Sequence, residues 1–443
     1  MDEMDTRVPD PFAVGDDEEE VEAYNDNLLT PTVPAQEAPG VQSPSPVQKD
    51  APPIPPPKII TKSQGDIRPL LSVNMFLPVP DSDPLTLLVA KYIPDPQARP
   101  RRDLSGDYTH TDLRTLIMTN SWRATARLAR DQLTSGRVQD VSEVLEWWCL
   151  RLHSLARLRL YNQTAAECTT LFNVISSLQP PEFCNHVKDL LPLDLDLCRC
   201  RLRYWANDSI GYVDALMLTL NSCKRSLAKA MKRNVQNATV DGSVERWTER
   251  CARVSLVLAS QLVEMKQYTT ATRILETMIL HPSAPPDLQG ALAMVYLQVG
   301  DLGAASFHLN ELAVNSRVDQ VTKTTNEILK ACFMGEWATA VDMLQGRAEE
   351  LVQTENYVQR AIDANNLAVA LLNLGKLSEG IAVLEDIFVH SPSMAVVAEP
   401  LIFNLATMYE LRSNTAMDRK TAMLSKVALW SGDGLRHAVL KLG

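Results

Sequence analysis

Basic residues are scarce where a nucleic-acid-binding protein would need them. The 443 residues carry 43 Lys and Arg against 54 Asp and Glu, which gives a formal net charge of −11. Residues 1–60 hold thirteen acidic and three basic residues, so the rest of the chain is close to neutral. A phosphate-binding surface needs a surplus of positive charge. The short basic clusters at 99–102 and 232–233 are therefore interpreted as solvated charge, and no nucleic-acid partner is expected.

Long apolar runs are missing too. No stretch of about 18 or more apolar residues occurs, so no membrane-spanning segment is predicted. The chain begins Met1-Asp2-Glu3 and stays acidic, whereas a secretory signal needs a basic start followed by an apolar stretch. The eight cysteines follow no disulfide framework, which is typical of reduced thiols in the cytosol. We expect a cytoplasmic protein.

Signatures of catalysis are also absent. No phosphate-binding loop exists, because Gly375-Lys376 is followed by Leu377. Neither an H-E-x-x-H zinc motif nor a G-x-S-x-G nucleophile motif occurs. The segment Gly432-Asp-Gly434 has no preceding strand and is not interpreted as a nucleotide loop. The sequence predicts a protein that is not an enzyme and that carries no cofactor.

One group of residues has the composition of a metal site. Cys184, His186, Cys198 and Cys200 lie close together in sequence. On a helix, however, Cys198 and Cys200 would point about 200° apart and could not share one ion. Core or surface cysteines are favoured over a zinc site, and no metal is expected.

Proline is unevenly distributed. Twelve of the 27 prolines lie in residues 1–60, with one Phe and one Tyr, so we predict a disordered acidic, Pro-rich tail there. Seven more between 69 and 100 mark a transition segment, 61–105, in which residues 85–90 could form a short docking helix. Only eight prolines follow, and β-hairpin signals are nearly absent, so the body is predicted to be all-α.

Four segments of the body repeat with a period of 34 to 40 residues. A turn position (266, 300, 335, 375) is followed at fixed offsets by a small residue and a leucine. Gly in the turn accepts a positive φ, the small residue lets two helices approach, and Leu fills the layer between helix pairs. Each pair leaves an apolar face that only a neighbouring pair can cover. The assigned repeat positions are Tyr296, Gly300, Ala305, Leu309, Gly335, Trp337, Ala340, Leu344, Ala368, Gly375, Gly380, Leu384 and Tyr409.

This pattern resembles tetratricopeptide repeats, which form an α-solenoid, a right-handed superhelix of helix pairs. We assign the solenoid to 244–443. Its last pair lacks the small residue, because Asp418 stands there, and is interpreted as a polar C-terminal cap. Two or three degenerate helix pairs are expected in 106–233. A polar linker loop, 234–243, separates them from the solenoid.

Two motifs near the C-terminus make the resemblance more specific. The stretches Asn365-Asn366-Leu-Ala368 and Phe403-Asn404-Leu-Ala-Thr-Met408-Tyr-Glu-Leu411-Arg-Ser413 are similar to the subunit 12 family of the trafficking protein particle (TRAPP) complex. The upstream pieces around Trp148, 295–302 and 335–337 match the same family in order. The resemblance covers about 110–443, and the N-terminal tail is much shorter than the family's.

The resemblance implies membership of a TRAPP-type complex, which tethers transport vesicles and promotes nucleotide exchange on Rab GTPases in endoplasmic reticulum to Golgi transport and autophagy. In that family the exchange chemistry belongs to small core subunits. The chain would be a non-catalytic scaffold that binds other large TRAPP subunits, and through them a Rab GTPase and transport vesicles. It would lie at the periphery of endoplasmic reticulum–Golgi intermediate and Golgi membranes.

Two further positions are candidate partner-binding sites. Asp10-Pro11-Phe12, beside the acidic block, resembles the peptide that clathrin-adaptor appendages recognise. Trp147 precedes Trp148 on one predicted helix, about 100° away, so at most one of them can point into the middle of a packed stripe. Either Trp147 lies at the margin of the core, or it is an anchor for a partner protein.

Two rival functions come from other classes. A chaperone adaptor would grip an acidic peptide with a Lys and an Asn four residues apart on a first helix. The corresponding pairs here, among them Thr325/Leu329 and Asn365/Val369, cannot hold a carboxylate. An exchange enzyme is the other rival, because exchange factors need no nucleotide-binding motif.

Overall fold

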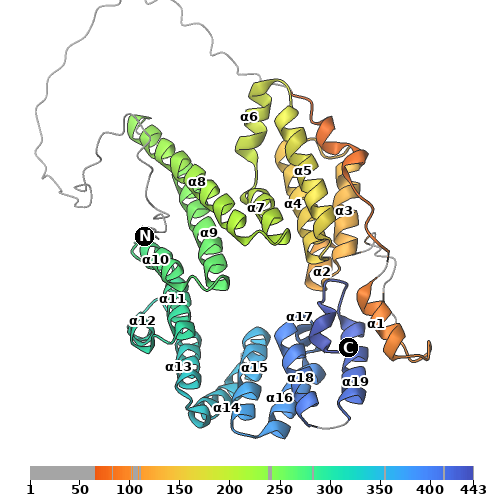
Figure 1. The fold of residues 1–443 in the computed structure, drawn as a ribbon, viewed down its shortest axis with the longest axis vertical. Helices are drawn as coiled ribbons and strands as arrows, with labels where there is room; N and C mark the ends of the chain where they lie inside the picture. Colours follow the sequence, from red (N-terminus) through yellow and green to blue (C-terminus); the bar gives the residue numbers. More distant parts are fainter. Residues whose placement is uncertain are drawn as a thin grey trace, which may run out of the picture. The chain divides into compact units, whose positions relative to one another are not determined.

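Every regular element in the described part of the chain is a helix (Figure 1). The computed structural model describes residues 65–81, 83–100, 102, 108, 111–237, 242–281, 284–353, 356–412 and 415–442. The prediction of an all-α fold is confirmed over these residues. The predicted tail, 1–60, lies outside them.

The helices follow one another along the chain. The first part of the chain contains η1 (Arg68–Leu71), η2 (Val73–Met75), α1 (Pro84–Tyr92), α2 (Leu113–Met118), α3 (Trp122–Thr134), α4 (Val141–Arg157), α5 (Tyr161–Ser177), α6 (Pro181–Leu190), α7 (Leu193–Trp205) and α8 (Ser209–Asn237). The second part contains α9 (Ser243–Glu264), α10 (Tyr268–Ile279), α11 (Pro286–Val299), α12 (Leu302–Val314), α13 (Gln320–Met334), α14 (Trp337–Gln353), α15 (Tyr357–Asn373), α16 (Leu377–His390), α17 (Pro392–Val397), α18 (Glu399–Arg412), α19 (Ala416–Trp430) and η3 (His437–Leu440).

One turn geometry recurs between paired helices along the whole body. Seven residues with positive φ follow the first helix of a pair: Asn120, Arg159, Asn207, Lys266, Gly300, Gly335 and Gly375. The N–H of the next residue bonds back to a carbonyl five positions earlier, as in Glu336 to Ala331 at 2.9 Å and Asp208 to Arg203 at 3.0 Å. This arrangement is a Schellman motif, which satisfies carbonyls that the helix end leaves unpaired. Helix pairs that share this turn therefore occur before residue 244 as well as after it.

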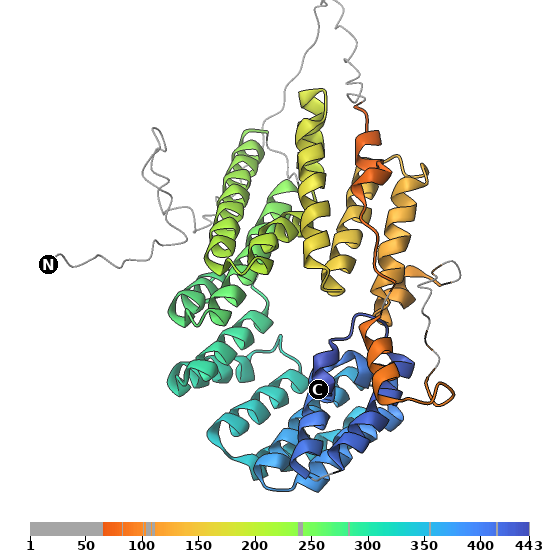
Figure 2. The ribbon, with the colours of Figure 1, turned by 45° about the vertical axis from the view of Figure 1, so that its right-hand side comes forward.

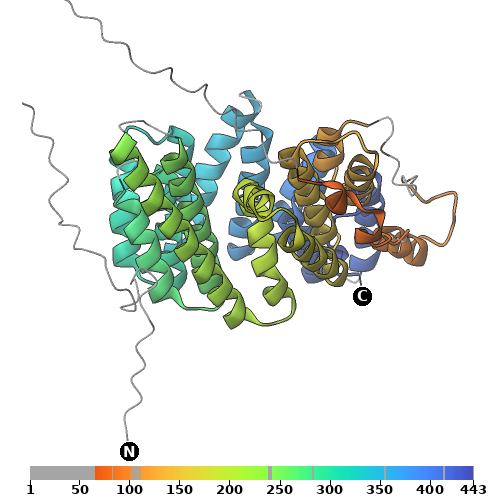
Figure 3. The same ribbon diagram turned by 90° about the horizontal axis from the view of Figure 1, so that it is seen from above.

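Two long helices flank the segment predicted as a linker, 234–243. Helix α8 continues to Asn237, past the predicted start of the linker at 234, and α9 begins at Ser243. The two helices pack against each other, and Figure 3 shows them in light green among the antiparallel helices that follow. Residues 63–443 form one compact unit, which includes both 106–233 and 244–443.

The first core is centred on Trp148 of α4. Its side chain is fully buried, its indole N–H donates to the carbonyl of Leu70 at 2.9 Å, and its ring stacks on Phe76 at 4.6 Å. Beside it, buried Arg151 donates to both carboxylate oxygens of Glu167, at 2.6 and 3.0 Å. These contacts hold the segment that contains η1 and η2 in place against α4 and α5.

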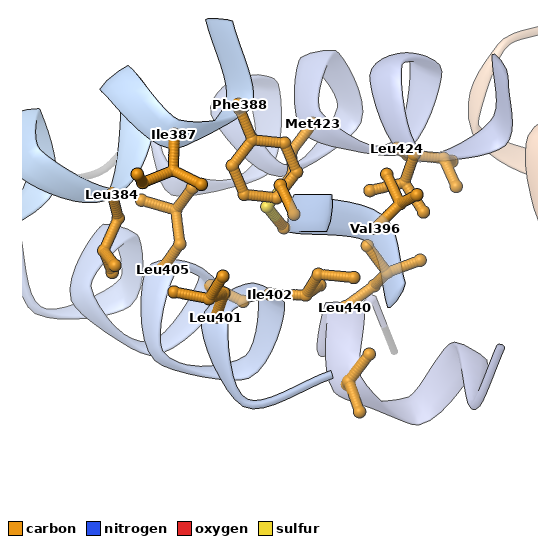
Figure 4. Packing of buried hydrophobic residues seen from close by; sticks show 14 of the residues in the cluster. Leu384, Ile387, Phe388, Val396, Leu401, Ile402, Leu405, Met423, Leu424 and Leu440 are labelled. Atoms are coloured by element: carbon orange, nitrogen blue, oxygen red, sulfur yellow. The ribbon is translucent and has the colours of Figure 1, made fainter. Parts of the chain in front are cut away.

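A second core fills the C-terminal helices (Figure 4). Leu384, Phe388, Ile402 and Leu424 come from α16, α18 and α19 and meet there. Helix α1 belongs to this core as well, through Leu85, Val89 and the residue that follows the helix, Ile93. The orange helix in Figure 2 lies beside the blue C-terminal helices for this reason.

Helix α1 packs on α19, the helix for which a polar C-terminal cap was predicted. Met423, Leu424 and Val427 of α19 are buried, and the apolar side of α1 packs on that helix. A cap with a polar outer face was expected, because Asp418 replaces the small residue. Asp418 is exposed in the first turn of α19. The apolar side of the later turns of α19 is covered by α1, which comes from near the start of the described chain. Helix α1 thus covers part of the last helix pair, at the place where the polar cap was predicted.

Candidate interaction surfaces

The repeat positions assigned from the sequence fall at equivalent places in successive helix pairs. Gly300, Gly335 and Gly375 have φ of 87°, 78° and 76° and end α11, α13 and α15. The small positions in the second helices, Ala305, Ala340 and Gly380, are all buried. The leucine positions Leu309, Leu344 and Leu384 are buried one turn later, and Ala368 of α15 is fully buried. At Gly380, an added Cβ would lie 3.1 Å from the carbonyl oxygen of Ala368, so the two helices are in close contact there.

The aromatic repeat positions differ in their surroundings. Tyr296 donates its hydroxyl to Glu276 and stacks on His308 at 5.7 Å. Trp337 is half-buried beside the core of α13, α14 and α15. Tyr409 is buried and donates to Glu385 at 2.7 Å, and burial is the main reason that its pKa is raised. All three therefore join neighbouring helices.

An apolar groove of about 460 Å³ lies between α14, α15 and α16. Its lining is Leu344, Ala348, Leu351, Arg360, Asp363, Ala364, Leu367, Ala382, Val383, Asp386 and Ile387. Arg360 and Asp386 pair at 3.0 Å and are both partly exposed. The groove thus offers an apolar floor with a charged pair at its edge, which suits an aliphatic side chain of a protein partner.

The polar wall of the groove is fixed by a buried ion pair. The Arg347 guanidinium donates to both oxygens of Asp363, one at 2.7 Å, and to the Thr325 hydroxyl at 2.9 Å. Gln359 donates to the same carboxylate at 2.8 Å. The pair links α13, α14 and α15, and no residue of it was singled out in the sequence.

The paired asparagines of the C-terminal motifs are in direct contact. The amide of Asn404 in α18 donates to the side-chain oxygen of Asn365 in α15 at 2.8 Å. This bond joins the first helices of two successive pairs.

Trp147 lies at the margin of the first core. It is half-buried against that core, and its indole N–H reaches Glu143 at 3.3 Å. A role as an anchor for a partner stays a prediction. Asp10, Pro11 and Phe12 lie outside the described residues.

The segment Gly432-Asp433-Gly434, which the sequence left without a role, binds the turn between α2 and α3. Asp433 accepts hydrogen bonds from the backbone N–H groups of Trp122 and Arg123 at 2.7 and 3.1 Å, and pairs with the Arg123 guanidinium at 2.7 Å. The N–H of Gly432 donates to the Thr119 carbonyl at 2.9 Å, and that of Gly434 to Asn120 at 3.0 Å. Asp433 thus supplies the N-cap that the first turn of α3 lacks from its own sequence.

We call residues 431–434 and the residues that they contact the C-terminal clasp. A second contact reinforces it. Buried Arg102 pairs with Asp83 at 2.7 Å. The same guanidinium donates to the carbonyls of Ala428 and Ser431 at 2.6 and 2.8 Å. Arg102 therefore ties the start of α1 to the end of α19.

The described residues hold neither a candidate membrane span nor a candidate metal site. No helix there is long and apolar enough to cross a membrane. Within the same residues, no group of three or more His, Cys, Asp or Glu side chains is arranged to hold a metal ion.

The described residues thus define an all-helical protein of stacked tetratricopeptide-type pairs, with protein-facing surfaces as its candidate sites. The chain is similar to trafficking protein particle complex subunit 12 of Homo sapiens, at 26% identity over 386 residues that cover 80% of this chain and 52% of the relative. The subunit of that name from Mus musculus is 25% identical, covering 80% of this chain and 48% of the relative. The chain spans about half the length of these curated relatives. The predicted resemblance is confirmed.

The chain was also compared with protein-family models and with solved structures. No family model matches the chain. Among solved structures, the P58(IPK) TPR domain is 12% identical, with 78% of this chain and 97% of that chain covered and a TM-score of 0.18.

Proposed function

We propose that the chain is a scaffold subunit of a TRAPP-type complex and has no catalytic role of its own. The similarity over 80% of the chain to proteins named as subunit 12 of that complex is the observation that carries the proposal. The fold supports it, because stacked helix pairs present extended surfaces to other proteins. The partners would be other large subunits. A Rab GTPase and transport vesicles would be reached through them.

The setting of this role is part of the proposal. A TRAPP-type scaffold would act in transport between endoplasmic reticulum and Golgi and in autophagy, at the cytoplasmic side of those membranes. Clathrin-adaptor binding through Asp10-Pro11-Phe12 is a further, separate proposal. Phe12→Ala should abolish capture by an adaptor appendage and leave assembly with large subunits intact.

Co-purification tests the assembly. Tagged full-length chain should recover large TRAPP subunits in fixed stoichiometry. Ala340→Leu, which overpacks α14 against its neighbours, should recover less of them, while Asp342→Asn, on the exposed side of the same helix, should recover as much as the unaltered chain. Recovery of chaperones in place of these subunits would favour an adaptor. Recovery of neither would overturn the proposal.

A further inference from the structure

The second half of α8 carries positive charge alone (Figure 1). Between Asp214 and Asp241 no acidic residue occurs, and the charged residues are Lys224, Arg225, Lys229, Lys232 and Arg233. The pair at 232–233 was interpreted from the sequence as solvated charge. The structure places this pair on a helix, where residues 229 and 225 lie about one and two turns before it.

Packing of α8 leaves these charges on its outer side. Four of them are exposed on one side of the helix, which we call the basic face: Arg225, Lys229, Lys232 and Arg233. Leu216 and Leu220 are fully buried, and α8 packs on α7 and α9. At about 100° per residue, Lys229 lies opposite Leu220, and Lys232 lies about 160° from Leu216. The basic face therefore points away from the core and extends over about 12 Å of helix.

The four cations have no acidic partner among the described residues. None of their side chains makes an ion pair or a hydrogen bond with another described residue. The neighbouring helices differ, because Arg253 of α9 pairs with Asp194 of α7 at 2.8 Å. Like charges four residues apart, as in Arg225 with Lys229 and Lys229 with Arg233, destabilise a helix. The basic face thus costs α8 some of its stability and lacks the negative charge that would offset this.

We propose that the basic face of α8 docks on an anionic membrane surface. Phospholipid headgroups such as phosphatidylserine supply the missing negative charge, and each Lys or Arg near such a surface strengthens binding about fivefold. A flat, diffuse partner suits the face better than a protein does. The side chains between the cations are Ser226, Ala228 and Met231, and none is an aromatic anchor of the kind that dominates protein interfaces. This contact goes beyond the proposed function, in which membranes are reached through other subunits.

Sedimentation of the purified full-length chain with lipid vesicles tests the proposal. Phosphatidylcholine vesicles with about 30% phosphatidylserine should recover the chain at low salt, and vesicles of phosphatidylcholine alone should not. The net charge of −11 repels an anionic surface, so recovery requires a local basic surface. Binding should be lost at about 0.5 M salt, where a Debye length of about 4 Å screens the cations.

Two matched double variants locate the contact. Arg225→Gln/Lys232→Gln removes one Arg and one Lys from the basic face and should weaken vesicle binding about 25-fold, at about fivefold per cation. Arg273→Gln/Lys426→Gln removes the same charge from exposed positions of α10 and α19, and should bind nearly as well as the unaltered chain. Circular dichroism checks that both variants fold.

Three outcomes would overturn the proposal. Equal recovery by the two kinds of vesicle is the first. Equal loss in the two double variants is the second, because net charge alone would then account for binding. The third is a chain that binds a polyglutamate peptide through Arg225 and Lys232 but binds no vesicle, which would assign the basic face to an acidic protein. None of these measurements depends on assembly with other subunits, so the proposed function stands or falls separately.

Discussion

Asp433 accepts a hydrogen bond at 2.7 Å from the backbone N–H of Trp122, a residue 311 positions earlier in the chain. Helix N-caps are normally supplied by the residue that precedes the helix, and Ser121 occupies that place before α3 without making a side-chain cap. The cap comes instead from the C-terminal clasp. The contact makes the order of an early helix depend on residues near the end of the described chain.

Replacing Asp433 by alanine should destabilise the protein strongly. Arg123 is almost completely buried, and the substitution leaves its guanidinium without its carboxylate as well as removing the cap. Loss of one partner of a buried ion pair costs about 3–5 kcal/mol in free energy of unfolding. The thermal unfolding midpoint measures the effect. The double variant Arg123→Met/Asp433→Ala should lose less than the two single variants together, and strict additivity would contradict the buried pairing.

Gly432→Ala should open the C-terminal clasp through sterics alone. A Cβ at this position would lie 2.4 Å from the carbonyl oxygen of Asn120, a backbone atom that cannot move aside cheaply. We expect proteases to cut the segment after α19 more readily than in the unaltered chain. Gly346→Ala is the matched control, because a Cβ there meets nothing within 4 Å on an exposed side of α14. It should stabilise the helix by about 0.5–1 kcal/mol, so equal behaviour of the two variants would refute the clasp.

Ala340→Leu tests the stacking of the pairs. Ala340 is fully buried in the core that α13, α14 and α15 share, and overpacking of this kind costs about 1–3 kcal/mol. In a solenoid the damage reaches neighbouring pairs, since stability depends on nearest-neighbour interfaces. The unfolding midpoint should fall, and Asp342→Asn should leave it unchanged. An unaltered midpoint in Ala340→Leu would mean that the repeat register is wrong.

Asp196→Asn should stabilise the protein at neutral pH but not in acid. Burial in α7 raises the pKa of the Asp196 carboxyl, with Arg250 and Arg199 opposing it. Between the unfolded pKa, near 3.9, and the raised folded value, the folded state binds more protons, so the contribution of this group to stability falls as pH rises. The midpoint difference between variant and unaltered chain should be positive at pH 7 and should vanish below the unfolded pKa. A constant difference at all pH values would exclude this cause.

The turns of the later pairs were predictable because glycine marks them. Gly300, Gly335 and Gly375 lack a Cβ and so adopt the positive φ of the turn without a steric clash. Their regular spacing therefore marks the turns in the sequence. Asn120, Arg159 and Asn207 adopt the same conformation earlier in the chain. Left-handed backbone costs such residues roughly 1–2 kcal/mol, which packing of the pair offsets, so their identity gives no comparable signal.

The clasp and the charged wall of the groove were beyond sequence reasoning for a different reason. Arg102, Arg151 and Arg347 look like ordinary surface arginines, since their acidic partners become adjacent only after the helices pack. Asp418 was misleading in the same way. Its polarity correctly indicated an exposed position, but whether a helix end is capped depends on what docks beside it, and α1 supplies that contact from elsewhere in the chain.

The distance along the chain between Asp433 and α3 has a consequence for synthesis. At roughly 5–20 residues per second, the 310 residues from Arg123 to Asp433 take about 15–60 seconds to translate. Helix α3 leaves the ribosome first and must wait that long for its N-cap. Throughout this interval the Arg123 side chain in the first turn of α3 has no carboxylate partner, so the growing chain is exposed to chaperones and proteases until Asp433 has left the ribosome.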